Sequence, residues 1–475
     1  MNKTIDSIRE IFDTIPIKDG MTLSFHHHLR EGDLVINMVL AEIKRRGLRD
    51  MTLAPSSLFP VHEPLVELIE AGNIRNIVTN YVNGPVARAL SLGKLKGELI
   101  MDTHGGRARA IEEGDLPIDV AFIAVPTADA KGNGTGAYGP SACGTLGYAI
   151  PDLFHAKHRV VITDHLVDRV EPVDIDGSRV DHVVLVERIG DANKIVSGTT
   201  RPTRDPIQTK IARDTAQLID ELGLIKNGLS FQTGAGRTSI AVAKALEAIM
   251  EERGIKGNFA SGGITGHLVR MFEKGLFRRL YDVQCFDLEA VSSYYRNEDH
   301  VMMSSSDYAN PHREDAIVDR LDVVCLGATE VDLDFNVNVT TDSFGFLIGG
   351  SGGHADTAAG AKLTIVTAPL FKARIPLVKK RVTTITTPGH TVDCIVTERG
   401  IAINPARTDL IERLAGSRLT VAPIGSLMAF AHDLTGIPED RTAREASIGR
   451  VRYRDASTID HLYRVKDGSD DLPND

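Results

Sequence analysis

The chain has 475 residues, 42% hydrophobic and 25% charged, a composition typical of a globular protein with two or three domains. Its 54 lysines and arginines against 64 acidic residues give a formal charge of -10, which argues against a nucleic-acid-binding protein. The sequence shows neither an apolar run long enough to cross a membrane nor the apolar core of a secretory signal. We therefore expect a cytoplasmic protein with no membrane partner, and its four scattered cysteines agree with a reducing compartment.

The first half of the chain alternates short apolar segments with amphipathic segments whose apolar residues recur at helical spacing. Continuous apolar strands interleaved with helices are typical of a parallel sheet that is buried on both faces. The predicted strands are Met21–Phe25, Met51–Ala54, Ile74–Thr79, Val120–Val125 and Arg159–Thr163, and the predicted helices are Leu34–Arg45 and His62–Ala71.

The same order starts again in the second half. Gly228–Gln232 resembles Gly20–Phe25 in composition, and a helix is predicted after each. We interpret this as a weak internal duplication, visible in the order of elements rather than in identical residues. The predicted elements here are the strands Gly228–Gln232, Asn258–Ala260, Asp322–Leu326 and Leu363–Thr367, and the helix Ser239–Arg253.

These patterns predict an α/β fold of two tandem open domains, each built on a mainly parallel sheet. We place the N-terminal domain at residues 1–222 and the C-terminal domain at residues 223–466, with the boundary near Leu222. The polar segment 467–475 is predicted to be a disordered tail.

Glycines cluster at the predicted carboxyl ends of strands, where open α/β sheets bind ligands. Glycine lets backbone N–H groups approach a ligand closely, and the following helix N-terminus adds the positive end of a dipole. One such cluster alone is better explained as a tight turn, but several at corresponding places favour an anion-binding cleft between the domains. The clusters are residues 129–147, residues 234–237 with Gly234, Gly236 and Arg237, and residues 349–353 with Gly350, Gly352 and Gly353.

A run of three histidines, His26, His27 and His28, stands just before Arg30. Adjacent histidines on a strand point to opposite faces, and no carboxylate follows at the spacing of a helical zinc site, so we expect no metal here. Because arginine binds carboxylates through two parallel hydrogen bonds, we favour a site for a polycarboxylate. The alternative is a solvated surface loop. A second, similar donor set follows at His104 and Arg107.

The sequence shows no clear nucleophile. The Gly-x-Ser-x-Gly turn that carries the serine of many hydrolases does not occur. Cys143 lies in a glycine-rich stretch and could be reactive, although a small buried apolar residue is the commoner role for such a cysteine.

Several longer motifs occur together along the chain: Ser24-Phe25-His26-His27 with Gly32-Asp33, residues 141–150, Phe335–Val339, residues 347–358, Ile401–Arg407 and Val451–Asp455. In combination they resemble the citrate lyase alpha subunit family, over nearly the whole chain. The chain begins later than family members that carry an N-terminal extension. More distantly, Ile17–Thr22, Thr127–Asp129 with Gly132-Asn133, Leu326–Ala328 and residues 350–353 resemble the CoA-transferase superfamily. That resemblance implies two CoA-transferase-like domains with the active site between them.

One departure from the superfamily bears on mechanism. Covalent CoA-transferases carry a nucleophilic glutamate in a Ser-Glu-Asn-Gly motif, and the corresponding stretch here is Ser261-Gly262-Gly263. A glycine therefore replaces the glutamate, which implies no glutamyl-CoA intermediate and a reaction within a ternary complex.

The resemblance implies a citrate CoA-transferase that exchanges acetate for citrate on an acyl-carrier thioester. Gly350, Gly352 and Gly353, with Gly262 and Gly263, would then stabilise the oxyanions. The predicted substrate-binding residues are His26, His27, Arg30, His104 and Arg107, and those for the carrier arm are Gly234, Gly236 and Arg237. The implied partners are a citryl-lyase beta subunit and an acyl-carrier gamma subunit, in an oligomer. The carrier would bring the CoA-like prosthetic group, so this chain needs no permanently bound cofactor, and acetyl-CoA would serve as a surrogate.

Three alternatives remain open. The first is a related transferase for citramalate or another short carboxylic acid, which would share the fold and motifs. The second is a non-catalytic scaffold subunit, which intact glycine loops with clustered histidine and arginine disfavour. The third is a sugar-phosphate isomerase, against which two tandem domains without an evident acid/base carboxylate pair argue.

Overall fold

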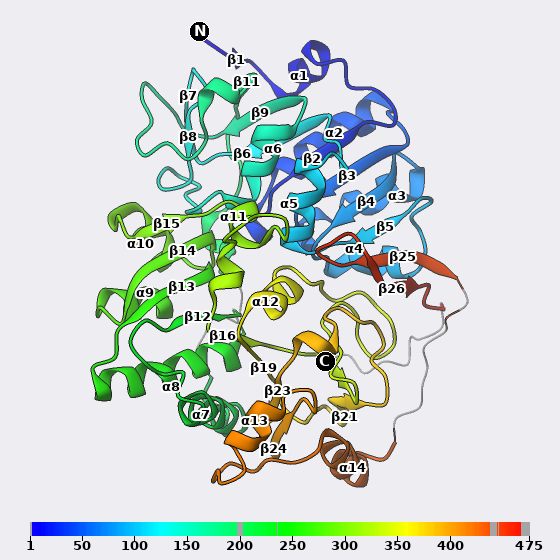
Figure 1. Cartoon of the computed structure of the whole chain (residues 1–475). Helices are drawn as coiled ribbons and strands as arrows, with labels where there is room; N and C mark the ends of the chain where they lie inside the picture. Colours follow the sequence, from blue (N-terminus) through cyan, green and yellow to red (C-terminus); the bar gives the residue numbers. More distant parts are fainter. Residues whose placement is uncertain (1, 197–202, 235, 438–443, 445, 467–475) are drawn as a thin grey trace.

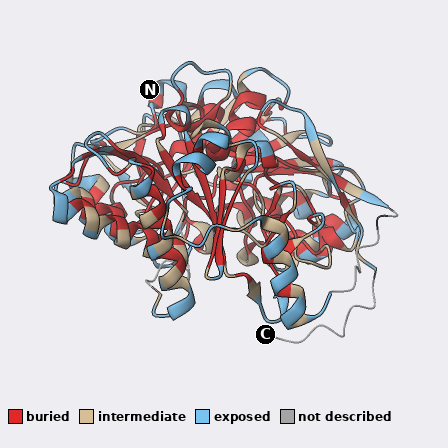
Figure 2. Cartoon of the chain, turned by 60° about the horizontal axis from the view of Figure 1, so that its bottom comes forward, coloured by how far each residue is buried: buried red, intermediate tan, exposed pale blue. Residues whose placement is uncertain are grey.

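The computed structural model describes residues 2–196, 203–234, 236–437, 444 and 446–466. The chain forms two lobes, one from its first part and one from its second, and each is built around a sheet flanked by helices (Figure 1). The central strands of both lobes are buried almost throughout (Figure 2). The predicted α/β fold with two tandem, mainly parallel open sheets is confirmed.

The first sheet forms the N-terminal lobe. In the spatial order given next, all its strands from β1 to β25 are parallel, and β26 pairs antiparallel with β25 at the edge. In spatial order the strands are β1 (Thr4–Ile5), β11 (His182–Leu185), β9 (His158–Thr163), β6 (Val120–Ala124), β2 (Thr22–Phe25), β3 (Met51–Pro55), β4 (Ile74–Thr79), β5 (Leu99–Met101), β25 (Ser447–Arg452) and β26 (Thr458–Tyr463).

The second sheet forms the C-terminal lobe. It is parallel from β15 through to β23, and β24 adds antiparallel. The strands in spatial order are β15 (His300–Met302), β14 (Phe277–Cys285), β13 (Gly257–Ile264), β12 (Ser230–Thr233), β16 (Val323–Leu326), β19 (Leu363–Thr367), β23 (Cys394–Thr397) and β24 (Gly400–Ile403).

Helices connect the strands in both lobes. In the first lobe, α1 (Ile8–Thr14), α2 (Val35–Arg46), α3 (Leu65–Ala71) and α4 (Gly84–Ser91) contact one another in sequence, whereas α5 (His104–Glu112) packs on α6 (Ile150–His155). The helices of the second part are α7 (Pro206–Glu221), α8 (Arg237–Arg253), α9 (Gly266–Glu273), α10 (Leu288–Arg296), α11 (Ser305–Ala309), α12 (His354–Gly360), α13 (Thr408–Arg413) and α14 (Ile424–Thr435). Helix α5 also packs on α11, so the two lobes meet along this pair.

All the strands and helices predicted above are present, with ends that differ by a few residues. Helix α2 shows why the pattern was informative. Val35, Val39 and Ile43 recur every four residues and are buried in the core, and Gly47 ends the helix with a positive φ of 66°.

The internal duplication is confirmed by the sheet order. Strands β11, β9, β6, β2, β3 and β4 correspond, in the same order and direction, to β23, β19, β16, β12, β13 and β14. The turns after β6 and β16 match in detail as well. Asp129 accepts a side-chain hydrogen bond from Asn133 at 2.8 Å, and Asp332 accepts the same bond from Asn336 at 3.2 Å. The two halves therefore repeat both a topology and a turn.

Each lobe also carries a small accessory sheet. The pairing is the same in both: the middle strand is antiparallel to one neighbour and parallel to the other. The strands are β8 (Gly134–Thr135), β7 (Thr127–Asp129) and β10 (Leu166–Val167) in the first lobe, and β18 (Val337–Asn338), β17 (Glu330–Asp332) and β22 (Val378–Lys379) in the second. The second lobe adds the short pair β20 (Phe371–Lys372) and β21 (Ile375–Pro376).

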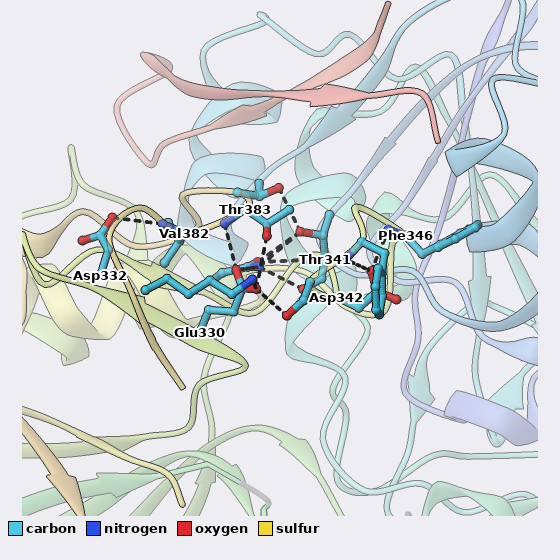
Figure 3. Close-up of polar contacts among 12 residues, drawn as sticks. Glu330, Asp332, Thr341, Asp342, Phe346, Val382 and Thr383 are labelled. Atoms are coloured by element: carbon cyan, nitrogen blue, oxygen red, sulfur yellow. Dashed lines mark hydrogen bonds and ion pairs between the residues drawn. The ribbon is translucent and has the colours of Figure 1, made fainter. Parts of the chain in front are cut away.

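A buried carboxylate ties the second accessory sheet to the segment that leads into residues 349–353. Glu330 accepts hydrogen bonds from Asn338 Nδ2 at 3.0 Å, Ser343 Oγ at 2.6 Å and the Thr383 N–H at 2.8 Å, and it pairs with Lys379 (Figure 3). Full pairing of this kind is what a fully buried charge requires. Glu330 is fully buried, and its bonds fix the segment that ends in the glycine-rich turn.

The observed limits of the two lobes differ from the predicted boundary at Leu222 in two places. Helix α7 lies before Leu222 but packs on α8, β19 and β23 of the second lobe. The hairpin β25–β26 lies within the predicted second domain, 223–466, but extends the first sheet through β5. A pairing between residues about 350 positions apart leaves no local signal in the sequence. The predicted tail, 467–475, lies outside the described residues.

Candidate active site

The three histidines follow β2 at its carboxyl end, in a buried segment that we call the histidine loop (residues 26–30). Asp33 fixes the end of this loop, because it accepts the Val35 N–H at 3.2 Å and contacts His62 Nε2 at 3.1 Å. The backbone leaves the strand here, so adjacent rings do not point to opposite faces: the rings of His27 and His28 lie 6.3 Å apart between centroids and are nearly parallel, at 3°. The solvated-loop alternative therefore does not describe this segment.

The histidine loop and helix α5 meet on one tyrosine. The ring of Tyr148 lies 4.5 Å from that of His27 and 4.4 Å from that of His104, measured between centroids. His28 completes the group, at 5.6 Å from Tyr148. The two predicted donor sets, from the ends of β2 and β5, are thus brought into contact by a residue that the sequence analysis did not single out.

Burial keeps these imidazoles neutral. Burial, and after it the charge of Arg107, lowers the pKa of His26 well below its usual value. Burial likewise lowers the pKa of His104 to about 3. Neither nitrogen of His26, nor Nδ1 of His104, forms a hydrogen bond with the described part of the chain. Buried polar atoms without partners are rare and costly, which favours a polar ligand here.

Arg30 is held without an acidic partner. Its guanidinium lies over Phe59 of the first lobe, 5.5 Å from the ring centroid, and over Phe286 of the second lobe, at 4.9 Å. No ion pair or hydrogen bond of this side chain is formed with the described residues, and the backbone has a φ of 50°. A cation clamped between two aromatic faces with its donors unused is suited to bind an anion.

Arg107 is placed differently from Arg30. It is 2% exposed, and its Nη2 donates to Ser24 Oγ at 2.6 Å, to the Ala54 carbonyl at 3.0 Å and to Asp152 at 3.0 Å. Asp152 in turn lies 3.5 Å from His26 Nδ1. This geometry favours a supporting role for Arg107 beneath the histidine loop rather than the direct substrate contact predicted from the sequence.

Residues 349–353, which we call the glycine loop, reach the same place from the second lobe. The His104 N–H donates to the Gly352 carbonyl at 2.9 Å, and a Cβ at Gly353 would lie 2.4 Å from the Tyr308 hydroxyl. Gly352 has a φ of 51°, which side chains rarely allow. The N–H groups of Gly350 and Gly353 form no hydrogen bond with the described residues, so they are available to a ligand.

Gly262 and Gly263 lie in β13, at a point where its register with β14 shifts. A Cβ at Gly262 would lie 2.5 Å from Nε2 of Gln232, and this amide donates to the Tyr308 hydroxyl at 2.7 Å. Since Tyr308 also lies against Gly353, Gln232 and Tyr308 together link the two glycine sets. Gly262 and Gly263 pair with β14, however, which makes them less accessible donors than the glycine loop.

The third predicted set lies at the end of the neighbouring strand. Gly234 follows β12, and its N–H donates to the Cys325 carbonyl at 3.2 Å. Gly236 caps α8, and Arg237 is the first residue of that helix. These residues follow Gln232 directly in the chain, so they stand next to the glycines of β13 along the same edge of the sheet.

Two further contacts join the lobes at the site. Gln284 of β14 donates to the His27 carbonyl at 2.8 Å. Asp356 of α12 is buried and accepts hydrogen bonds from Thr103 Oγ1 at 2.8 Å and the Gly105 N–H at 2.9 Å, on either side of His104. Burial, the largest cause, raises the pKa of Asp356 to about 6. These contacts fix the positions of His27 and His104 relative to the second sheet.

Among the described residues, one group could hold a metal ion: Asp282, Cys285 and His300, all buried. Their donor atoms already bond to one another, since Asp282 Oδ2 lies 3.0 Å from both the Cys285 sulfur and His300 Nε2. The histidine loop is not part of this group. The described part of the chain also contains no helix long and apolar enough to cross a membrane.

Comparison with known proteins agrees with this arrangement. A family model for the alpha subunit of citrate lyase (CitF) matches residues 1–465. The chain belongs to the citrate lyase alpha subunit family. Among curated members, the alpha chains of Klebsiella pneumoniae and Escherichia coli K12 are each 45% identical to it, across 98% of this chain and 92% and 91% of theirs. The family resemblance found in the sequence motifs is therefore confirmed, and the alpha chain is by name one component of a larger citrate lyase.

Solved structures extend the comparison. A citrate lyase alpha subunit from Streptococcus mutans, crystallised in complex with citrate, is 43% identical over 98% of this chain and 92% of its own, with a TM-score of 0.96. The alpha subunit of a malonate decarboxylase from Acinetobacter baumannii is 17% identical, with a TM-score of 0.66 over 93% of this chain and 87% of its own. The second likeness shows a shared fold only.

Sequence reasoning missed four residues of this site. Tyr308 and Gln284 are isolated side chains whose importance arises only where distant segments meet. Tyr148 and Asp356 stood inside motifs that were used for the family resemblance, but their contacts with His104 and with α5 could not be foreseen.

Proposed function

We propose that the chain is a citrate CoA-transferase, which converts an acetyl-carrier thioester and citrate to a citryl-carrier thioester and acetate. The observation that carries the proposal is Arg30, a clamped cation with no acidic partner, in the same loop as His26, whose two ring nitrogens lack hydrogen-bond partners among the described residues. Family membership supports it, as does the 43% identical relative that was crystallised with citrate.

The acid would bind between Arg30 and the histidines. Citrate has three carboxylates, of which one reacts and two need partners. Arg30 supplies a charged, two-pronged donor, whereas neutral His26, His27 and His104 can donate or accept single hydrogen bonds. A single cation among neutral imidazoles leaves the reacting carboxylate less strongly bound than its neighbours, which preserves it as a nucleophile.

The reaction would take place in two acyl transfers. A carboxylate oxygen of citrate attacks the acetyl carbonyl carbon, the C–S bond breaks, and a mixed anhydride and the carrier thiolate result. The thiolate then attacks the citryl carbonyl, the C–O bond to acetate breaks, and acetate leaves. Both steps pass through a tetrahedral oxyanion, and the chain contributes orientation and oxyanion stabilisation rather than a covalent bond.

The glycine loop is the best-placed oxyanion site. The unused N–H group of Gly353 belongs to a residue that packs on Tyr308, and that of Gly350 to a residue that packs on Asn80 and Tyr81, on either side of Gly352 next to His104. Gly352 would shape the turn. Gly262 and Gly263 would line the side of the oxyanion site opposite the glycine loop, where Gln232 connects β13 to Tyr308. Losing one preorganised donor costs roughly 3 kcal/mol of barrier in enzymes of known mechanism.

A covalent glutamyl route is disfavoured at the position where the superfamily places its nucleophile. Gly262 has a φ of 100°, and any Cβ there would collide with the Gln232 side chain. A glutamate could not take this backbone conformation without strain. This supports direct reaction between acid and thioester in a ternary complex.

The thioester would arrive on a separate carrier. The proposed partners are a gamma subunit with a CoA-like prosthetic group and a beta subunit that cleaves the citryl thioester. The carrier arm would contact Gly234, Gly236 and Arg237. These residues lie between the end of β12 and the start of α8, just beyond Gln232 in the chain. The proposed location of the assembly is the cytoplasm.

A panel of acids tests the proposal. The full chain, alone and together with its beta and gamma subunits, is given acetyl-CoA and one acid at a time, and released acetate and new acyl-CoA are measured. With the chain alone we expect equal amounts of acetate and citryl-CoA, with citrate preferred over monocarboxylates; with the beta subunit present the citryl thioester is cleaved, so acetate alone is the measure there. Preference for citramalate would reassign the substrate, and acid-independent acetate release or none in any mixture would contradict the proposal.

A further inference from the structure

Tyr148 stands out as a buried ring whose hydroxyl the fold leaves unbonded. The residue is 4% exposed, yet no hydrogen bond involves its hydroxyl among the residues that the structure describes. Its backbone is fixed, because its N–H donates to His28 Nε2 at 3.3 Å. The hydroxyl oxygen is not among the fully buried atoms that lack a partner, so solvent reaches it. A fixed donor that is open to solvent beside His27 and His104 is available to a ligand.

The ring of Tyr148 is rigidly placed. It packs on His27 at 4.5 Å and His104 at 4.4 Å, and it belongs to a small core with Met303 and Tyr308. A side chain held on several sides cannot swing to another partner without disturbing both lobes. Its hydroxyl therefore has a fixed direction before any ligand binds, which lowers the entropic cost of binding.

Ring contacts of the site link Arg30 to Tyr148. Phe59 touches both Arg30, at 5.5 Å, and His27, at 6.1 Å, and His27 stacks on Tyr148. The phenol and the guanidinium also interact electrostatically in both directions, since Tyr148 favours the charged Arg30 and Arg30 favours a charged Tyr148. Burial nevertheless raises the pKa of Tyr148 well above its usual value, so the phenol stays a neutral donor.

We infer that the Tyr148 hydroxyl is a substrate-binding donor that shares one non-reacting carboxylate of the polycarboxylate with Arg30. This rests on the proposed function and adds a specificity-determining residue to it. A carboxylate has two oxygens with room for several donors, so a guanidinium on one side and a phenol on the other are compatible. An acid that lacks this carboxylate would leave both donors buried and unpaired, which is a strong means of rejection.

Citrate binding to the full-length chain provides the test, because it needs no carrier. Isothermal titration calorimetry would compare wild type, Tyr148→Phe, Arg30→Met and the double variant. Tyr148→Phe removes only the oxygen, so the ring stack remains. A hydrogen bond to a charged group is worth about 1.5–3 kcal/mol, so we expect the Kd for citrate to rise roughly 10- to 100-fold. Because both donors bind one carboxylate, the double variant should weaken binding less than the product of the two single effects.

Tyr294→Phe is the matched control. Its hydroxyl bonds to Asp174 outside the site, so this variant should bind citrate like wild type. A second readout is spectroscopic. The chain has nine tyrosines and no tryptophan, so citrate should produce a tyrosine difference spectrum in the near ultraviolet that Tyr148→Phe abolishes.

The outcomes separate the two proposals. If wild type does not bind citrate at all, the proposed function fails. If wild type binds citrate but Tyr148→Phe binds it equally well, this inference fails and the proposed function stands. If the double variant weakens citrate binding by the full product of the two single effects, the inference that Tyr148 and Arg30 bind the same carboxylate is overturned. If Tyr148→Phe lowers kcat and leaves the Kd unchanged, the hydroxyl stabilises the transition state instead of binding the substrate.

Discussion

The site divides its work between one charged residue and several neutral ones. Arg30 is the cation without a partner, whereas His26, His27, His28 and His104 are neutral through burial. A site with four charged imidazoles would hold every carboxylate of the acid equally strongly and would suppress the nucleophile. For the proposed transfer, this arrangement would therefore separate recognition of the acid from its reactivity.

Replacing Arg30 with alanine tests recognition. We expect KM for citrate to rise roughly 10- to 100-fold with little change in kcat, because a charge-assisted bond made equally in ground and transition states is lost. The loss should shrink for acids with fewer carboxylates. Initial rates with acetyl-CoA over a range of acid concentrations measure this. A fall in kcat at constant KM would place Arg30 in the transition state.

The buried histidines also predict a dependence of stability on pH. A histidine whose folded pKa is lowered stays neutral in the fold but is protonated in the unfolded chain below about pH 6.5, so its contribution is present above that pH and is lost as the pH falls. With a folded pKa of about 3 for His104, wild type should lose about 2 kcal/mol between about pH 7 and about pH 5 relative to His104→Asn.

Urea unfolding of the two proteins at both pH values measures this difference. The comparison between variants is needed because Asp356, with a raised pKa of about 6, acts in the opposite sense and favours the fold as the pH falls. Parallel stability curves for wild type and His104→Asn would show that His104 is not buried as a neutral ring.

Single residues divide into those that sequence reasoning could find and those that it could not. Arg30 and the histidines were found because unusual residues cluster near a strand end. Arg107 belonged to the same kind of pattern, but its hydrogen bonds to Ser24 and Asp152 depend on packing beneath the loop. Tyr148 follows a glycine-rich segment and resembles an ordinary core aromatic, so only its unpaired hydroxyl identifies it.

The hairpin β25–β26 connects the end of the chain to both lobes. Arg452 pairs with buried Asp102, with Nε at 3.0 Å from the carboxylate, at the entry to α5. Arg454 donates to the Ala309 carbonyl at 3.0 Å and lies 3.7 Å from Asp356. The hairpin thereby fixes the start of α5, and with it His104, against the second lobe.

Arg452→Met should therefore destabilise the protein strongly. It leaves the fully buried Asp102 carboxylate without its cation, which typically costs about 3–5 kcal/mol. Arg450 on the same strand provides the control, because its pair with Glu98 is exposed and Arg450→Met should cost about 1 kcal/mol or less. Urea unfolding measures both. Equal effects of the two variants would show that the hairpin does not depend on the buried pair.

Apolar strands were predictable because they are buried in a parallel sheet and read as continuous apolar runs. Strand β9 is an example: the interior of its sequence is apolar, and both of its neighbours are parallel. Strands β25 and β26 were not predicted, because their residues mix charged and apolar side chains at the edge of a sheet. Edge strands carry a weaker pattern, and their partners are set by the whole fold.

The duplication explains why the site lies between the lobes. Two copies of one topology each present their strand ends and loops, and the contact of α5 with α11 brings the end of β2 opposite the ends of β13 and β14. The first copy provides the histidine loop and the second provides the glycine loop. Each copy alone would hold half of the donors, so in the proposed reaction the acid and the thioester would meet only where both copies are present.

Direct reaction between citrate and the thioester is best tested by kinetics combined with mass measurement. Initial rates are measured while citrate and acetyl-CoA are both varied, and the intact mass of the chain is recorded after incubation with acetyl-CoA alone. A ternary complex predicts intersecting lines in the double-reciprocal plot and an unmodified chain, because Gly262 offers no nucleophile. Parallel lines together with a CoA thioester on any glutamate would contradict it.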